Sequence, residues 1–84
     1  MIHVEAKGHI GTALGKKKLR LDVGGVDIKE LFRLVSSKSK TSLSISLESI
    51  LVIVNGVEIS ALNKDKTLLM PGDKITLIPI SHGG

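Results

Sequence analysis

The residues with the most distinctive chemistry in this sequence lie at its end, where it reads Pro79-Ile80-Ser81-His82-Gly83-Gly84. Glycine loses the most backbone freedom on ordering and has no side chain to pack, so Gly83 and Gly84 add nothing to a folded core. A frayed terminus without a role is one interpretation of such an end. The other is a requirement for backbone freedom, because glycine adopts unusual dihedral angles and lets another backbone approach closely.

Other patterns that could carry catalysis or bind a metal are incomplete. His3, His9 and His82 do not have the spacing of metal ligands, and the chain has no cysteine. The run from Gly11 to Lys16 resembles a phosphate-binding loop but is one residue short, and Lys17 stands where the magnesium-binding serine or threonine belongs. The carboxylates are scattered. We therefore expect no metal site, no stably bound cofactor and no enzyme activity.

The positive charge is concentrated in the lysine triplet Lys16–Lys18 and around residues 38–40, and the formal net charge is +4. Nucleic-acid interfaces favour basic residues interleaved with aromatic residues or arginine. This chain has one aromatic residue, Phe32, and only two arginines. We expect the lysines to solvate turns and to discourage pairing at sheet edges. RNA binding through Lys16–Lys18 remains the alternative.

Length and composition predict a single cytoplasmic domain over residues 1–84, with a flexible tail over residues 81–84. A chain of 84 residues suits one core. The first residues lack the pattern of a secretory signal, and the longest apolar runs are too short to span a bilayer. The lack of cysteine fits a reducing compartment. The lack of glutamine and the many lysines and isoleucines lean toward a thermophile.

The first half of the chain predicts two strands and a helix. Residues 2–7 and 18–23 alternate apolar and polar, the period of a strand with one buried face. The glycine-punctuated stretch between them predicts a hairpin loop, with the lysine triplet at its turn. An amphipathic helix follows, whose apolar residues recur at helical spacing: Ile28, Leu31, Phe32 and Val35. At its start, Asp27 is the expected N-cap, Glu30 is expected to reach back to it as in a capping box, and Val26 is the expected hydrophobic staple. We expect this helix to end near residues 36–38.

The second half predicts further strands separated by turns. Residues 44–47 could form a short strand or a packed loop. Residues 50–54 read as a central strand buried on both faces. A strand at residues 57–59, a polar turn at 63–66, a β-turn at 71–73 and a last strand at 74–81 follow. One main helix across one face of a mixed sheet of four or five strands is an α+β fold of the β-grasp (ubiquitin-like) type.

This pattern resembles the ubiquitin-like sulfur carriers and modifiers. That family includes the small subunit of molybdopterin synthase, the thiamine sulfur carrier, the small archaeal modifier proteins and the ubiquitin-related modifier. The resemblance covers nearly the whole chain, and its most specific parts are Gly72-Asp73, Leu77-Ile78-Pro79 and Gly83-Gly84. The ending Ser81-His82-Gly83-Gly84 is most similar to that of an archaeal ubiquitin-related modifier.

The resemblance implies that the carboxylate of Gly84 is the reactive group. An E1-like activating enzyme would use ATP to adenylate it, and the product would become a thiocarboxylate for a sulfur-acceptor enzyme or an isopeptide bond to a lysine of a target protein. Gly83 would give access to the active site, and Ser81 and His82 would contribute to recognition of the tail. Without cysteine, the chain would take its sulfur from another protein's persulfide or from free sulfide.

The resemblance also assigns Ile78 to a position that contacts partners. If Ile75 and Leu77 face the helix, Ile78 and Ile80 break the alternation, and with Pro79 they could form a docking patch. Ordinary core packing is the competing interpretation of these isoleucines. For the whole chain, the alternative function is a non-covalent β-grasp binding module.

Overall fold

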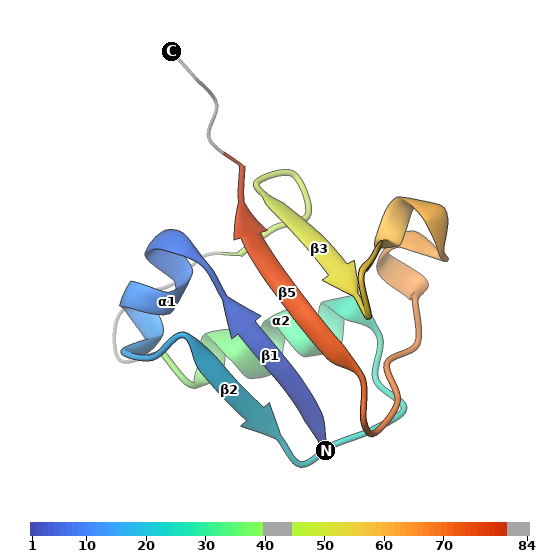
Figure 1. Cartoon of the computed structure of the whole chain (residues 1–84), viewed down its shortest axis with the longest axis horizontal. Helices are drawn as coiled ribbons and strands as arrows, with labels where there is room; N and C mark the ends of the chain where they lie inside the picture. Colours follow the sequence, from blue (N-terminus) through green and yellow to red (C-terminus); the bar gives the residue numbers. More distant parts are fainter. Residues whose placement is uncertain (40–44, 81–84) are drawn as a thin grey trace.

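A five-stranded mixed sheet forms one layer of the molecule, and helix α2 crosses one face of it (Figure 1). The computed structural model describes residues 1–39 and 45–80. The sheet order is β2-β1-β5-β3-β4, with β5 in the centre, parallel to β1 and antiparallel to β3. The elements are β1 (Ile2–Ala6), α1 (Gly8–Leu14), β2 (Lys18–Leu21), α2 (Ile28–Ser37), β3 (Ile50–Val54), β4 (Val57–Glu58), the 3-10 helices η1 (Ile59–Ala61) and η2 (Lys64–Lys66), and β5 (Lys74–Pro79). The predicted α+β class is confirmed.

The core lies between the sheet and α2, because alternate strand residues point toward the helix. The apolar residues of the strands that are buried there are Ile2, Val4, Ala6, Leu19, Leu21, Ile50, Val52, Val54, Ile75 and Leu77. Helix α2 contributes the predicted stripe of Ile28, Leu31, Phe32 and Val35. Burying one such aliphatic side chain stabilises the fold by about 1.5–3 kcal/mol.

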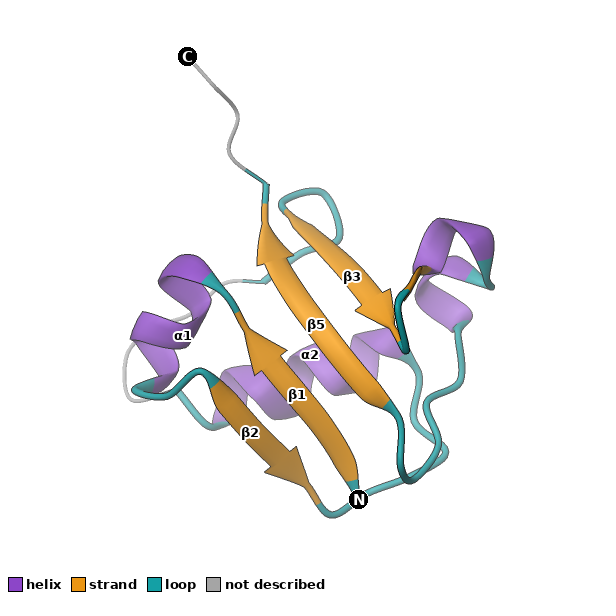
Figure 2. Ribbon diagram, viewed as in Figure 1, coloured by secondary structure: helices purple, strands orange, loops and turns teal. Residues whose placement is uncertain are grey.

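Strand β3 is buried on one face only, so the prediction that it is buried on both faces is wrong. Its burial alternates, with Leu51 and Ile53 only partly buried. Helix α2 covers one face of the sheet, and Figure 2 shows the strands unobstructed from the other side. The apolar run of β3 therefore places two branched side chains on the open face, where solvent reaches them.

The stretch between β1 and β2 is the short helix α1 and not the predicted hairpin loop. The antiparallel pairing of β1 with β2 is as expected, from Ile2 opposite Leu21 to Glu5 opposite Lys18. Helix α1 buries Ile10 and Leu14, spaced i and i+4, and ends on Gly15 with a φ of 77°. Apolar residues at i and i+4 and a C-terminal glycine are both typical of a helix. The sequence prediction gave more weight to the glycines of this stretch and therefore expected a loop.

Gly11 lets α1 lie directly on the end of β1. A Cβ at this position would stand 2.7 Å from the carbonyl oxygen of Ala6, closer than two such atoms can approach. The backbone N–H of Lys16 then donates to the carbonyl of Gly11 at 3.1 Å. A glycine that the sequence prediction took for a loop residue is therefore required by close packing inside a helix.

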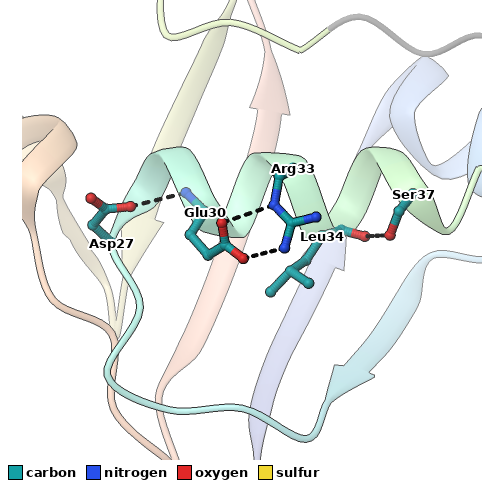
Figure 3. A network of polar contacts seen from close by, with 5 residues as sticks. All are labelled: Asp27, Glu30, Arg33, Leu34 and Ser37. Carbon is teal, nitrogen blue, oxygen red and sulfur yellow. Dashed lines mark hydrogen bonds and ion pairs between the residues drawn. The ribbon is translucent and has the colours of Figure 1, made fainter.

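Helix α2 begins as predicted at Asp27, whose carboxylate accepts a hydrogen bond from the backbone N–H of Glu30 at 2.9 Å (Figure 3). The predicted return contact from Glu30 is wrong. Its carboxylate instead binds the guanidinium of Arg33, one turn further on, with Nε donating at 2.9 Å. The hydrogen bond from Arg33 lowers the pKa of Glu30; desolvation partly opposes this shift, and the charge of Arg33 adds to it. The helix ends at Ser37, inside the predicted range.

The remaining connections follow the predicted turns with local differences. Asn55 and Gly56 form the turn between β3 and β4, both with positive φ. Val26 packs against the core and forms an isolated antiparallel β-bridge with Leu69, while its role as a hydrophobic staple stays a prediction. Of the predicted strand or loop at 44–47, residue 44 lies outside the described residues. Residues 45–49 have no strand, and Ile45 packs against the core, in keeping with the packed loop.

Candidate functional site

Strand β5 leads to the predicted reactive end of the chain. It ends at Pro79, two residues earlier than predicted, and Ile80 is the last residue described. The backbone N–H of Lys7 donates to the carbonyl of Leu77, and that of Ile80 donates to the carbonyl of Ser49, both at 2.9 Å. The chain is therefore tied to its neighbours on both sides up to Ile80.

The predicted activation residues Gly83 and Gly84 and the predicted recognition residues Ser81 and His82 lie outside the described residues. Their roles remain predictions, as does the flexible tail over residues 81–84.

The start of β5 is fixed by the Gly72-Asp73 pair that the resemblance singled out. Pro71 and Gly72 form a tight turn in which Gly72 has a φ of 94°, a value that favours glycine. The Asp73 carboxylate accepts from the backbone N–H of Met70 at 2.8 Å and from the side-chain amide of Asn55 at 3.0 Å. Asn55 in turn accepts from the backbone N–H of Lys74 at 2.9 Å. Asp73 thus joins the turn before β5 to the turn after β3.

Burial along β5 alternates, and Ile75 and Leu77 face the helix, the condition on which the predicted docking patch depends. Ile75 and Leu77 are fully buried against the helix layer, while Thr76 and Ile78 are partly buried on the open face. Pro79 is partly buried and Ile80 is 43% exposed. Ile78 is therefore not a residue of the main core, which favours the docking interpretation. Docking itself stays a prediction.

On one side of β5, the open face of the sheet is apolar. Leu51 of β3 lies opposite Ile78 and Ile53 opposite Thr76, and we call the cluster of Leu51, Ile53 and Ile78 the apolar half. Leu51 also lines a groove of about 310 Å³, which it shares with the exposed side chains of Leu47 and Ile80 and with polar residues of β4, η1 and η2. Apolar surface next to the end of β5 is suited to hold a partner that reaches the following residues.

On the other side of β5, the open face is basic. His3 lies opposite Arg20 across the β1–β2 pair and beside Lys74 of β5, and Glu5 lies opposite Lys18. A groove of about 700 Å³ is lined by these five side chains together with Lys16. We call His3, Glu5, Lys16, Lys18, Arg20 and Lys74 the basic half.

Glu5 is the one carboxylate in the basic half, and cations surround it. Lys7 Nζ donates to it at 2.8 Å, and Lys74 Nζ lies 3.8 Å from its other oxygen. The hydrogen bond from Lys7, followed by the charges of Lys7, Lys74 and Lys18, lowers its pKa. Lys16 and Arg20 have no ion-pair partner among residues 1–39 and 45–80.

The basic half was missed in the sequence prediction, which assigned the lysine triplet to a turn. The sequence pattern that could have revealed it is the set of polar residues that alternate with apolar ones in the first two strands. These are His3 and Glu5 on one strand and Lys18 and Arg20 on the other. Once the two strands pair in register, these residues must share a face. The contribution of Lys74 needs the parallel pairing of β1 with β5, which local pattern does not specify.

The histidines do not form a metal site in the part of the chain that the structure describes. His3 lies on β1 and His9 in α1. No group of three potential ligands comes together within residues 1–39 and 45–80. Over the same residues, no helix is both long and apolar enough to cross a membrane.

Comparison by sequence gives no match, either to a protein-family model or to a curated protein. Comparison of structures gives clear matches. The small archaeal modifier protein SAMP1 from Methanosarcina acetivorans has a TM-score of 0.79 at 23% identity, covering 99% of this chain and 95% of that chain. Urm1 from Trypanosoma brucei has a TM-score of 0.77 at 21% identity, covering 99% and 94%.

A chain of the BexX/CysO complex from Amycolatopsis orientalis matches over the full length of both chains, with a TM-score of 0.76 and 20% identity. A putative molybdopterin converting factor subunit from Pyrococcus furiosus has a TM-score of 0.77 at 15% identity, covering 95% and 97%. The modifier and molybdopterin proteins are among those that the sequence resemblance had named. At such identities the likeness is one of fold, and this chain therefore has the β-grasp, ubiquitin-like fold.

Proposed function

We propose that this chain is a ubiquitin-like modifier or sulfur carrier that is activated at the carboxylate of Gly84. It is a substrate and carrier for other enzymes rather than a catalyst. The observation that carries the proposal is the position of β5: the central strand of the sheet leads directly to the residues that end in Gly83-Gly84. The likeness in fold to SAMP1, Urm1 and the molybdopterin converting factor subunit supports the same kind of function.

The chemistry that we propose begins with ATP bound by an E1-like enzyme. A carboxylate oxygen of Gly84 attacks the α-phosphate, pyrophosphate leaves, and an acyl-adenylate results. Free sulfide then displaces AMP to give a thiocarboxylate. In another route, the terminal sulfur of another protein's persulfide displaces AMP to form an acyl disulfide; a second thiol then breaks the S–S bond, forms a disulfide with that protein's cysteine and releases the same thiocarboxylate. Alternatively, a lysine amine of a target protein displaces AMP and forms an isopeptide bond. The chain has no cysteine, so the sulfur comes from outside it.

We assign docking of the activating enzyme to Ile78, Pro79 and Ile80 together with the apolar half. Glycines at 83 and 84 present no Cβ, so the enzyme can enclose the end of the chain in a narrow channel. Ser81 and His82 connect this channel to the docking patch and contribute to recognition. Both the use of ATP and a reducing supply of sulfur place this activity in the cytoplasm, in keeping with the lack of cysteine.

The test is a denaturing immunoblot of cells that express an N-terminally tagged copy, beside a copy lacking Gly83-Gly84. We expect the truncated copy to melt at an unchanged temperature, because β5 and its neighbours end before these residues. A ladder of heavier species that disappears on truncation indicates protein modification. A single band whose intact mass shows sulfur in place of one oxygen indicates a sulfur carrier.

A control carries two glutamines in place of Lys29 and Lys38, which are exposed and lie in α2 and at its C-cap, outside the sheet. Its ladder or thiocarboxylate should equal that of the unchanged chain. If neither product forms from the full-length chain, or if the truncated chain restores function to a deletion strain, the carrier proposal is wrong. A non-covalent β-grasp module then becomes the better account.

A further inference from the structure

The basic half of the open face is the strongest feature that the proposed function leaves unused. We infer that it is a docking surface for an extended acidic segment of a partner protein, laid along strand β2. The inference goes beyond activation at Gly84 and does not depend on it.

Charge complementarity identifies the partner's chemistry. Four cationic side chains and one carboxylate line the groove, and the carboxylate of Glu5 is already held by Lys7 and Lys74. Lys18 and Arg20, both exposed, extend from β2 into the same space. Cations that line one groove repel one another, and an anionic partner relieves that repulsion. The groove therefore favours a ligand with several carboxylates.

The geometry of β2 favours an extended segment. β2 is an edge strand, so a row of backbone groups faces away from β1 and is available for strand addition. Lys18 and Arg20 lie roughly 7 Å apart along the open face, since alternate strand residues are separated by two rises of about 3.3 Å. A partner strand with an acidic side chain at every second position repeats the same spacing.

Edge protection alone does not account for these cations. Lysine on an edge strand commonly prevents unwanted pairing, and that would explain Lys18. Lys74, however, lies on the central strand β5, a position with neighbours on both sides. Cations on both β2 and β5, with β1 between them, form a surface and not only a guarded edge.

Nucleic acid fits this surface less well than an acidic polypeptide. Binding of single strands relies on aromatic side chains that stack on bases, and Phe32, the chain's one aromatic residue, is buried in the core. Glu5 also lines the groove, and its negative charge opposes a continuous phosphate backbone. Only one of the four cations, Arg20, has the planar group that stacks on bases and binds phosphates in a bidentate way.

The experiment uses the full-length chain and three fluorescent probes of equal length: a peptide alternating glutamate and threonine, the same peptide with glutamine for glutamate, and oligouridine. Binding is measured by anisotropy. The test variant is Lys18→Gln/Arg20→Gln. The matched control is Lys29→Gln/Arg33→Gln, which makes the same chemical change on exposed residues of α2, in the other layer.

We expect the glutamate peptide to bind, and the test variant to weaken it about tenfold or more at low ionic strength, while the control changes it less than about twofold. Adding salt should remove most of the difference in affinity between the test variant and the unchanged chain. In NMR titrations with the glutamate peptide, changes in amide chemical shift should be confined to β1, β2 and Lys74. The inference is overturned if the control weakens binding as much as the test variant, because net charge alone then explains it. It is equally overturned if the glutamate peptide fails to bind, or if oligouridine binds more tightly.

Discussion

The open face of the sheet carries two surfaces of opposite character, with β5 between them. The apolar half consists of the open-face residues Leu51 and Ile53 of β3 and Ile78 of β5. The basic half comes mainly from β1 and β2, whose open-face residues are His3, Glu5, Lys18 and Arg20, with Lys16 and Lys74 beside them. The covered face beneath both halves is uniformly aliphatic. The core thus restricts one side of every strand, while the other side is free to carry different recognition chemistry.

The two halves should act on a partner at different ranges. Apolar contacts stabilise a complex only at short range, by about 25 cal/mol for each Å² removed from water. Exposed charges act over a Debye length of about 8 Å at physiological salt and influence mainly the rate of encounter. We therefore expect the apolar half to determine how long a partner stays, and the basic half to determine how fast an acidic partner arrives.

The largest expected effect comes from placing a charge in the apolar half. We expect Ile78→Glu to reduce conjugate or thiocarboxylate formation at least thirtyfold, about 2 kcal/mol, the loss expected when a central interface residue is disrupted. The measurement is the yield of the modified chain in cells, normalised to the amount of folded protein. Because Ile78 is only partly buried, the variant should still fold.

Val57→Glu is the matched control for that charge. Val57 is 42% exposed, but it lies opposite Val54, whose side chain is on the covered face, so it is not part of the apolar half. Its product yield should stay within about twofold of the unchanged chain, as for a surface substitution outside an interface. Equal yields from Ile78→Glu and the unchanged chain would show that Ile78 only packs.

A second prediction concerns the support beneath the basic half. Gly11→Ala should lower the free energy of unfolding by roughly 1–2 kcal/mol, because the new methyl group and the carbonyl oxygen of Ala6 must move apart. The measurement is urea denaturation, with the exposed Thr12→Ala as control. Unchanged stability would mean that α1 can move away from β1 at no cost, and that the position of Lys16 in the groove is loosely held.

A third, smaller effect on stability is expected at Asp73, which connects the turn before β5 to the turn after β3. Asp73→Ala removes acceptors for Met70 and Asn55, at a cost of about 1 kcal/mol, because water reaches these exposed groups and replaces part of each bond. Asp73→Asn keeps one acceptor and should recover part of the loss. If both variants are as stable as the unchanged chain, the Gly72-Asp73 motif depends on its turn alone.

Sequence reasoning succeeded where one local rule dominated. Alternation predicted the covered face of β1 and β2, and the Asp27 cap and apolar stripe predicted α2, because each depends on residues a few positions apart. It failed at Gly11, where glycine is required by a neighbouring carbonyl rather than by a turn. It also failed at Glu30, where Arg33 competed successfully for the carboxylate. The basic half was missed because Lys74 joins it only through long-range pairing of β5 with β1.

The smallest expected effect is a change in how the melting temperature depends on pH when Glu5 is replaced. The pKa of Glu5 is lowered first by its hydrogen bond from Lys7 and then by the charges of Lys7, Lys74 and Lys18. A carboxylate with a lowered folded-state pKa stabilises the fold fully above its unfolded-state value, and loses that contribution as pH falls through the folded-state value. Melting temperatures measured from neutral pH down through the acid range should therefore fall less steeply for Glu5→Gln than for the unchanged chain. Glu48→Gln, which changes an exposed glutamate on the loop before β3, is the control. Parallel curves for all three chains would show that solvent screens the cations around Glu5, so that they do not stabilise its ionised carboxylate in the folded state.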